Sequence, residues 1–263
     1  MGVGDLVDLK IRYEDLLSGD PISVNGVGHI RSPKLKEMSP SSGIGWDGYS
    51  IYIYFLKAGC EQLKKDILKN DVIDGSIYEI ITQNCDLRTL YEKAFSFFML
   101  ETVAYEETNN VFVSIASVPD EESDDCVKNI PIGLISESNF DDVRAMILTM
   151  NYITLSQTDV KTTHSSDASK AAWDEVQNYL NKQVESTPKD DGPMTLGNMM
   201  SKLCAIHPSI NYTNIFDLTV FQFYDTFFQT CYMRSISFSE AVVSNHGSKD
   251  FKYEDWLNPI KNS

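Results

Sequence analysis

Hydrophobic residues recur at helical spacing in several parts of the chain. From about Gly48 to Lys69 they return every three or four positions, which predicts a helix. Asp86 and Asn139 each precede a similar pattern and are expected to be N-caps. Further helices are expected over 167–184, 194–207, 213–233 and 239–244. The segment between Gly75 and Asn84 fits neither the helical nor the strand period, so its structure is left open at this point.

Alternation and β-branched residues predict two hairpins. Ile22–Val24 and Val27–Ile30 flank Asn25-Gly26, and this pair favours a type I′ turn because both residues tolerate positive φ. The second hairpin joins 102–107 to 111–118 through Thr108-Asn109-Asn110. Ile132 to Ile135 is expected to form one more short strand.

The stretch from Asp120 to Asp125 is strongly acidic. It lacks the alternating ligand spacing and the central glycine of an EF-hand loop. We therefore interpret it as a solvated turn between strands.

The predicted strands all lie in the first 160 residues, whereas only helices are expected beyond them. This pattern is typical of an α+β fold, with a small antiparallel sheet and helices followed by an all-α C-terminal domain. The predicted divisions are an α+β domain at 1–160, a helix and linker at 161–193, and a helical domain at 194–263. The linker itself is 185–193, which contains two prolines, one glycine and no apolar residue.

The charge of the chain excludes several classes of partner. Its 263 residues include 22 Lys+Arg and 38 Asp+Glu, for a formal net charge of −16. Such a charge repels phosphate backbones and anionic lipids, so neither nucleic-acid nor membrane binding is expected. Five widely spaced cysteines predict reduced thiols in a cytosolic protein. No secretory signal is visible at the N-terminus.

No familiar catalytic constellation is present. Gly43-Ile-Gly-Trp-Asp-Gly48 matches the letters of a dinucleotide-binding loop, but no strand leads into it. The four histidines are scattered; His207 suits a structural position at a helix end, and His29 is expected at the surface. We therefore predict no catalytic residue, no cofactor, no metal site and no enzyme activity. A hydrolase or transferase without a recognisable motif stays as an alternative.

Aromatic residues are concentrated near the C-terminus. Seven of them lie between residues 216 and 232, and they cover more than one stripe of a helix. The helix is expected either to be wrapped on several sides as the centre of its domain, or to present one side to a partner, and both can hold together. The residues predicted to bind a partner are Phe221, Phe223, Phe228 and Tyr232. Replacing Phe223 and Phe228 with Ser is expected to abolish partner capture and leave the fold intact.

Three stretches together resemble a group of bacteriophage tail assembly chaperone-like proteins. The first runs from Tyr13-Glu-Asp-Leu-Leu-Ser-Gly-Asp-Pro-Ile-Ser-Val into His29-Ile-Arg-Ser-Pro-Lys-Leu-Lys-Glu-Met38. The second is Ser138-Asn-Phe-Asp-Asp-Val-Arg-Ala-Met-Ile-Leu148 with Asn151, and the third is His207-Pro-Ser-Ile-Asn with Asn214-Ile-Phe-Asp-Leu-Thr-Val-Phe-Gln-Phe-Tyr-Asp225. The chain departs from the group in the loop at 39–48 and in the acidic turn at 120–125.

The resemblance implies a morphogenesis protein of the host cytoplasm that coats the tape-measure protein during tail assembly. Its expected partner is therefore a tape-measure or other tail protein, with homo-oligomerisation left open. Two alternatives stay beside it. One is a structural tail or neck protein of the virion, and the other is an acidic binding or inhibitor protein that acts on host factors.

Overall fold

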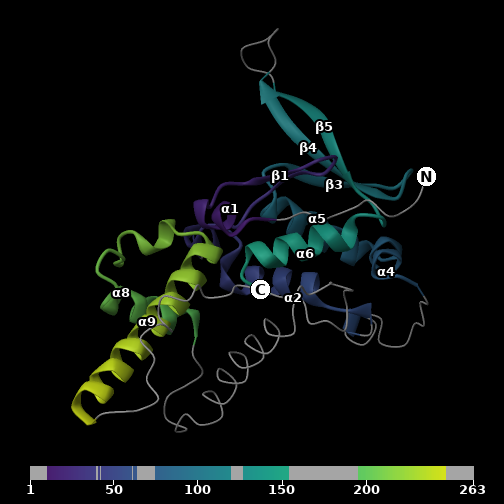
Figure 1. The fold of residues 1–263 in the computed structure, drawn as a ribbon. Coiled ribbons are helices and arrows are strands. Elements are labelled where there is room, and N and C mark those ends of the chain that lie inside the picture. Colours follow the sequence, from purple (N-terminus) through teal and green to yellow (C-terminus); the bar gives the residue numbers. More distant parts are fainter. Residues whose placement is uncertain are drawn as a thin grey trace. The chain divides into compact units, whose positions relative to one another are not determined.

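The computed structural model describes residues 11–39, 41, 43–60, 62–63, 75–119, 127–153 and 195–246. The chain forms two compact units (Figure 1). Unit 1 comprises residues 1–160 and 216–223, and unit 2 comprises 161–215 and 224–263. The strands belong to unit 1, and the described part of unit 2 is helical, which confirms the α+β class. The domain boundaries expected from the sequence stay a prediction.

Unit 1 contains five α-helices among the described residues, together with a short 3-10 helix, η1. They are α1 (Tyr13–Ser18), η1 (Leu35–Met38), α2 (Gly45–Lys57), α4 (Ile77–Gln83), α5 (Cys85–Phe98) and α6 (Phe140–Met150). The open segment at 75–84 is thus helical, and it begins with a capping box in which Ser76 accepts from the Glu79 backbone N–H. A capping box depends on only two polar side chains, so the spacing of apolar residues does not reveal it.

Two helix boundaries differ from the prediction. Helix α2 ends at Lys57, because Ala58 is extended, whereas the apolar spacing predicted a helix as far as Lys69. Residues 64–69 lie outside the described part. Helix α5 starts one residue after Asn84, whose side chain accepts from the Leu87 N–H at 3.0 Å. Asn84 is therefore the N-cap in place of Asp86. Asp86 lies in the first turn, where its negative charge interacts favourably with the positive end of the helix dipole.

The described residues contain five strands, which form two antiparallel sheets. Strands β1 (Ile22–Val24) and β2 (Gly28–Ile30) make a two-stranded hairpin, and β3 (Thr102–Glu106), β4 (Val111–Pro119) and β5 (Val127–Ile135) make a sheet in that order. Both predicted hairpins are confirmed. The predicted short strand at Ile132–Ile135 is the end of the nine-residue β5.

The turn of the first hairpin differs from the predicted type. Gly26 has a φ of 72°, but the φ of Asn25 is not positive. A type I′ turn needs a positive φ at both residues, so the turn is of another type. Val27 donates to the Val24 carbonyl across a three-residue loop. The loop then packs on β5, where the Leu134 N–H donates to the Gly26 carbonyl at 2.8 Å.

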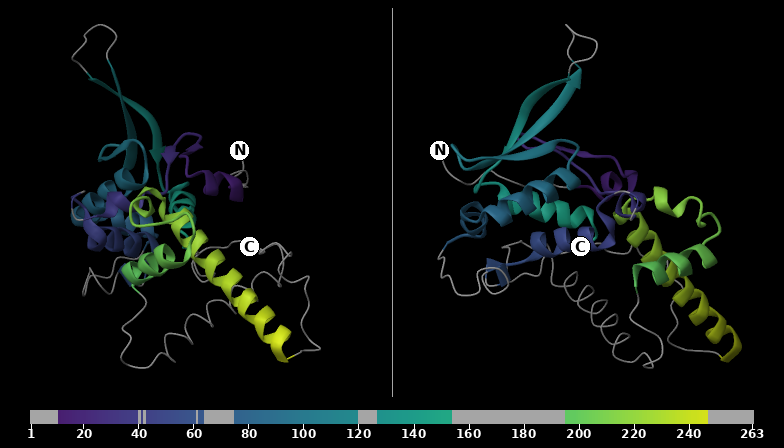
Figure 2. Two further views of the ribbon diagram at one scale, coloured as in Figure 1. Left: turned by 90° about the vertical axis from the view of Figure 1, so that its left-hand side faces the viewer. Right: turned by 180° about the vertical axis from the view of Figure 1, so that it is seen from behind.

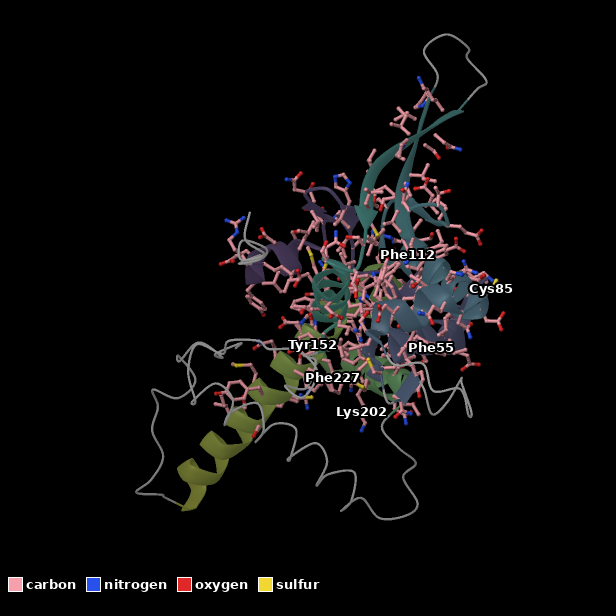
Figure 3. All side chains as sticks on the ribbon, turned by 90° about the vertical axis from the view of Figure 1, so that its right-hand side faces the viewer. Phe55, Cys85, Phe112, Tyr152, Lys202 and Phe227 are labelled. Carbon is pink, nitrogen blue, oxygen red and sulfur yellow. The ribbon has the colours of Figure 1, made fainter. Side chains whose placement is uncertain are left out.

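The core of unit 1 is aromatic. The inner face of the sheet contributes Phe112, and the helices contribute Tyr91, Phe95, Phe98 and Phe140, all of which are essentially inaccessible to solvent. Their rings meet mainly edge to face or tilted, at centroid distances such as 5.5 Å between Phe95 and Phe112. Phe112 lies at the base of the sheet, where the side chains are crowded (Figure 3).

Strands β4 and β5 extend beyond the rest of the sheet. Strand β3 pairs only with residues 111–115 of β4, so the remainder of β4 and the matching part of β5 form a two-stranded ribbon. Within unit 1 this ribbon projects away from the helices that pack under the sheet (Figure 2). A register shift between Ser114 and Ile115 marks a bulge where the ribbon leaves the three-stranded part.

Residues 216–223 complete unit 1. Their backbone pairs with the segment before η1: the Leu35 N–H donates to the Leu218 carbonyl, and the Val220 N–H donates to the Pro33 carbonyl, each at 2.9 Å. The ring of Phe221 packs on Tyr13 and Tyr152, with centroids 6.2 and 5.3 Å away. This segment follows α8 in the sequence but contributes Phe221 to the core of unit 1.

The described part of unit 2 consists of α8 (Leu196–Ile206), the start of the 3-10 helix η3 (Ile215–Asp217) and most of α9. Helix α9 spans Val220–His246, so it begins later than the predicted cap at 213–214. It also runs through the region where a separate helix at 239–244 was predicted. Its start is set by a reciprocal pair in which Gln222 N–H donates to Thr219 Oγ1 and Thr219 N–H donates to Gln222 Oε1.

The predicted acidic turn at 120–125, the helix at 167–184 and the linker at 185–193 lie outside the described residues.

Candidate protein-binding surface

Two of the four residues predicted to bind a partner are internal. Phe223 is fully buried and Phe221 is 5% exposed. The Phe221 backbone N–H also donates to Ser32 Oγ, which fixes the ring in the aromatic core of unit 1. A side chain enclosed by its own fold cannot contact a partner, so the prediction is corrected for both residues: Phe221 and Phe223 are core residues. The expectation that Phe223→Ser leaves the fold intact is physically inconsistent with this burial.

The other two residues lie on the part of α9 that belongs to unit 2. Phe228 is half-buried, with its ring stacked against Tyr224 at 6.3 Å and edge-on to Phe227 at 5.7 Å. One turn further on, Tyr232 is 38% exposed and Met233 is 46% exposed. Helix α9 is thus buried near its start and exposed further along, and its accessible apolar residues begin at Phe228.

A groove lined by both polar and apolar side chains runs beside this surface in unit 2. It is open, has a volume of about 460 Å³, and is lined by the end of α8 and one side of α9. Ile206 is the last residue of α8 and His207 is its C-cap, and Gln229, Met233 and Arg234 come from α9. His207 ends α8, and its Nδ1 accepts from the backbone N–H groups of Ser209 and Ile210. His207 therefore has the structural role predicted for it, although it caps the following turn rather than the last helix carbonyls.

His29 is tied to a buried carboxylate. Its Nδ1 lies 2.6 Å from Glu101 Oε1, and its backbone N–H donates to Glu101 Oε2 at 3.0 Å. Glu101 is almost completely buried, whereas the His29 side chain is 43% exposed, which agrees with the expected surface position. The sequence indicated neither the pair nor the burial, because 72 residues separate the two partners. The contact anchors β2 to the chain that leads into β3.

Three of the four charged side chains that line an open depression of unit 1, those of Arg31, Glu37 and Glu92, make hydrogen bonds within the unit. Arg31 donates to Glu37 at 2.6 Å and to the Phe97 carbonyl at 3.1 Å, and Glu92 accepts from the Tyr105 N–H. Within the described residues, no group of three or more His, Cys, Asp or Glu side chains is arranged to hold a metal ion. Burial raises the pKa of the Cys204 and Cys231 thiols, which disfavours the thiolate that a nucleophile requires.

Exposed apolar side chains also gather on strands β4 and β5 of unit 1. Val118, Ile130, Ile132 and Leu134 are between 37% and 48% exposed. They supply four of the twelve large hydrophobic side chains that are exposed in the described part of the chain. Val118, Ile132 and Leu134 belong to strands predicted from the sequence, whereas Ile130 does not. Alternation along a strand does not show which of its faces another layer covers.

Comparison with known proteins gives one match. Residues 185–261 match the family model of the YomV second domain, which is a phage-associated family. No curated protein and no solved structure matches the chain significantly. No helix among the described residues combines the length and the hydropathy of a membrane span. The matched region contains α8 and α9, including the accessible apolar residues described above, and it indicates a phage-derived protein.

Proposed function

We propose that this chain is a phage morphogenesis protein, and most specifically a tail assembly chaperone that binds the tape-measure protein in the host cytoplasm. It acts by reversible protein–protein contact and catalyses no reaction. The match to a phage-associated family supports a phage setting, and the resemblance of three stretches to tail assembly chaperone-like proteins supports the role. The formal charge of −16 keeps a protein with accessible apolar side chains soluble.

The observation that carries the proposal is the apolar surface on α9. Tyr232 and Met233 are exposed beside half-buried Phe228, within the region that matches the phage-associated family. Aromatic and methionine side chains are enriched at protein interfaces, because they bury a large area with few rotatable bonds or adapt to irregular partners. A partner would bury these side chains against its own apolar groups.

The proposal is tested by co-expression with the tape-measure protein of the same phage. A tagged chain is expected to retain that protein on an affinity column, and Phe228→Ser with Tyr232→Ser is expected to reduce the retained amount at least about tenfold. Tyr212→Ser is the matched control, because Tyr212 is an aromatic residue of unit 2 that is 66% exposed but lies outside α9.

Three results would contradict the proposal. Retention of the tape-measure protein by the double variant would show that α9 does not bind it. Failure of the unaltered chain to retain it would reject this partner. Presence of the chain in purified mature particles at the stoichiometry of a tail component would favour the structural-protein alternative.

A further inference from the structure

We propose that the exposed face of helix α2 is a self-association surface, and that its occupant is α2 of a second copy of this chain, packed antiparallel across a twofold axis. The exposed face is defined here as Asp47, Ser50, Ile51, Tyr54 and Lys57. It lies in unit 1 and shares no residue with the α9 surface, so this proposal and the proposed function can fail separately.

Helix α2 is an outer layer of unit 1. It lies on the side of α5 and α6 that faces away from the three-stranded sheet (Figure 1, Figure 2). Its inner side is fixed to those helices: the Tyr91 hydroxyl donates to the Phe55 carbonyl at 2.7 Å, and Arg144 donates to the carbonyl of the fully buried Leu56 at 2.9 Å. Eight of its thirteen residues are aliphatic or aromatic, a composition typical of a helix that is covered on more than one side.

The exposed face is a single stripe with apolar residues at its centre. Its members recur every three or four positions, so they share the side of the helix opposite Leu56. Ile51 is 48% exposed and Tyr54 is 42% exposed. The Ser50 hydroxyl donates to the Trp46 carbonyl, and the Tyr54 hydroxyl accepts from a glutamine amide, each at 2.9 Å. Burial of this centre therefore leaves neither hydroxyl without a hydrogen bond.

Opposite charges lie at the two ends of the stripe. Asp47 is in the first turn of α2 and Lys57 is in the last turn, and both are exposed. Within the described part of the chain, neither side chain takes part in an ion pair. The two residues are ten positions apart, which corresponds to about 15 Å along the helix axis. Both charges are thus available to a partner at the two ends of the apolar centre.

This order of charges is self-complementary. When a second α2 packs antiparallel about an axis near residue 52, Asp47 faces Lys57 of the second copy, and Lys57 faces Asp47 of the second copy. Ile51 then packs on Tyr54 of the second copy, and the twofold symmetry makes every contact twice. The net charge of −16 opposes association, but salt screens charges that lie more than about 8 Å apart, whereas the paired charges meet directly.

The size of the contact predicts its strength. A thirteen-residue helix is about 20 Å long and about 10 Å wide, so one face of it buries less than the roughly 800 Å² per partner of a standard interface. The dimer is therefore expected to be weak and to depend on concentration. For the function proposed above, a dimer offers two α9 surfaces to one long partner, and simultaneous binding of both raises the overall affinity.

Sedimentation velocity of the full chain, over a concentration series up to about 500 µM, tests the inference. The unaltered chain is expected to show a monomer–dimer equilibrium. Asp47→Lys and Lys57→Glu are each expected to weaken the dimer about tenfold or more, because like charges then face each other. Lys93→Glu is the matched control, since it makes the same change in net charge at an exposed lysine of α5.

Charge reversal separates this contact from the effect of the helix dipole, which Asp47 and Lys57 also suit. A chain with both Asp47→Lys and Lys57→Glu should dimerise again, although both charges then oppose the dipole of their own helix. An equimolar mixture of the two single variants should form a heterodimer, because both of its ion pairs join opposite charges. Ile51→Gln keeps a residue that is compatible with a helix and should weaken the dimer of the unaltered chain.

A chain that is monomeric at every concentration would overturn the proposal. A dimer that the two single charge variants and Ile51→Gln leave unchanged would also overturn it, because another surface would then join the copies. Failure of both the double reversal and the mixture to restore association would show that the two charges act only on their own helix. None of these results depends on retention of the tape-measure protein by α9.

Discussion

Arg144 lies in the interior of unit 1, where a charged side chain is costly unless it is paired. It is 3% exposed, and its guanidinium donates to the Leu56 and Ala58 carbonyls at 2.9 and 3.0 Å and to Asp141 at 2.8 Å. These carbonyls belong to the end of α2, where the helix dipole favours a cation. The buried Arg144 thus satisfies the acceptors left by the early end of α2.

Replacing Arg144 with Met is expected to lower the free energy of unfolding by about 3 kcal/mol, because two buried carbonyls lose their donor. Urea unfolding measures the change. Asp141→Asn is the control and is expected to cost less than about 1 kcal/mol, since Asp141 is 65% exposed. Equal losses of unfolding free energy in the two variants would show that Arg144 stabilises the fold through its ion pair with Asp141 and not through the carbonyls at the end of α2.

Tyr78 predicts how stability depends on alkaline pH. Its hydroxyl lies 2.7 Å from the Asn110 carbonyl and 3.2 Å from the Ile135 carbonyl, and burial raises the pKa of Tyr78 to about 12. In the unfolded chain tyrosine loses its proton near its ordinary pKa of 10.0. The free energy of unfolding is therefore expected to fall as pH rises from about 10 toward about 12, because only the unfolded state releases the proton there.

Urea unfolding at several pH values across this window tests the dependence. Tyr78→Phe should make the decrease shallower without removing it, because burial also raises the pKa of Tyr91. The same slope in Tyr78→Phe and in the unaltered chain would contradict the role assigned to Tyr78.

At the scale of elements, one glycine decides how the first hairpin meets the sheet. A Cβ on Gly133 would lie 2.4 Å from the backbone carbon and oxygen of Val27. The close approach is what lets the Leu134 N–H reach the Gly26 carbonyl. Strand propensity disfavours glycine at this position, so its presence reflects packing between elements rather than local preference.

Gly133→Ala is expected to lower the free energy of unfolding by about 1–3 kcal/mol, as an overpacked contact does. Hydrogen exchange of the Leu134 amide should also become faster. The matched control is Gly197→Ala in α8, where the new Cβ meets only Thr195 Oγ1 at 3.9 Å. That substitution is expected to raise helix stability by up to about 1 kcal/mol. If Gly133→Ala left the free energy of unfolding unchanged, the loop of the first hairpin would be able to move away from β5 without an energetic cost.

At the scale of the whole molecule, residues 216–223 pack against elements from the beginning of the chain. The Gln222 side chain donates to the Leu17 carbonyl at 2.8 Å, and Phe221 packs between Tyr13 and Tyr152. The first 160 residues therefore need a segment from beyond the 185–193 stretch to complete their core.

A protease site inserted between Thr187 and Pro188 tests this dependence. After cleavage, the two fragments are expected to elute together in size-exclusion chromatography and to separate only in denaturant, because Phe221 is buried in the core of unit 1. Phe221→Ala is expected to weaken the association by about 3 kcal/mol or more. Separation of the unaltered fragments in native buffer would contradict the packing.

Local patterns determined much of the fold from the sequence alone. Alternation in 102–106 and 111–118 located the second hairpin, and the apolar period of α6 placed Phe140, Val143, Ile147 and Met150 on its buried face. These features depend on neighbours within one element, where side-chain spacing and burial are directly linked. The α+β class follows from the order of such elements.

Only the tertiary structure decided which aromatic residues were accessible. Phe221, Phe223, Phe228 and Tyr232 all lie on one helix, and spacing alone treats them alike. Residues 216–223 turn back to fill unit 1, so Phe221 and Phe223 are enclosed, while Tyr232 stays at the surface. The same holds for β5, where Ile132 and Leu134 are 40% and 48% exposed, because strand alternation does not show whether another layer covers a face. Burial depends on contacts between residues far apart in the chain, whereas periodicity reports only which side chains share a face.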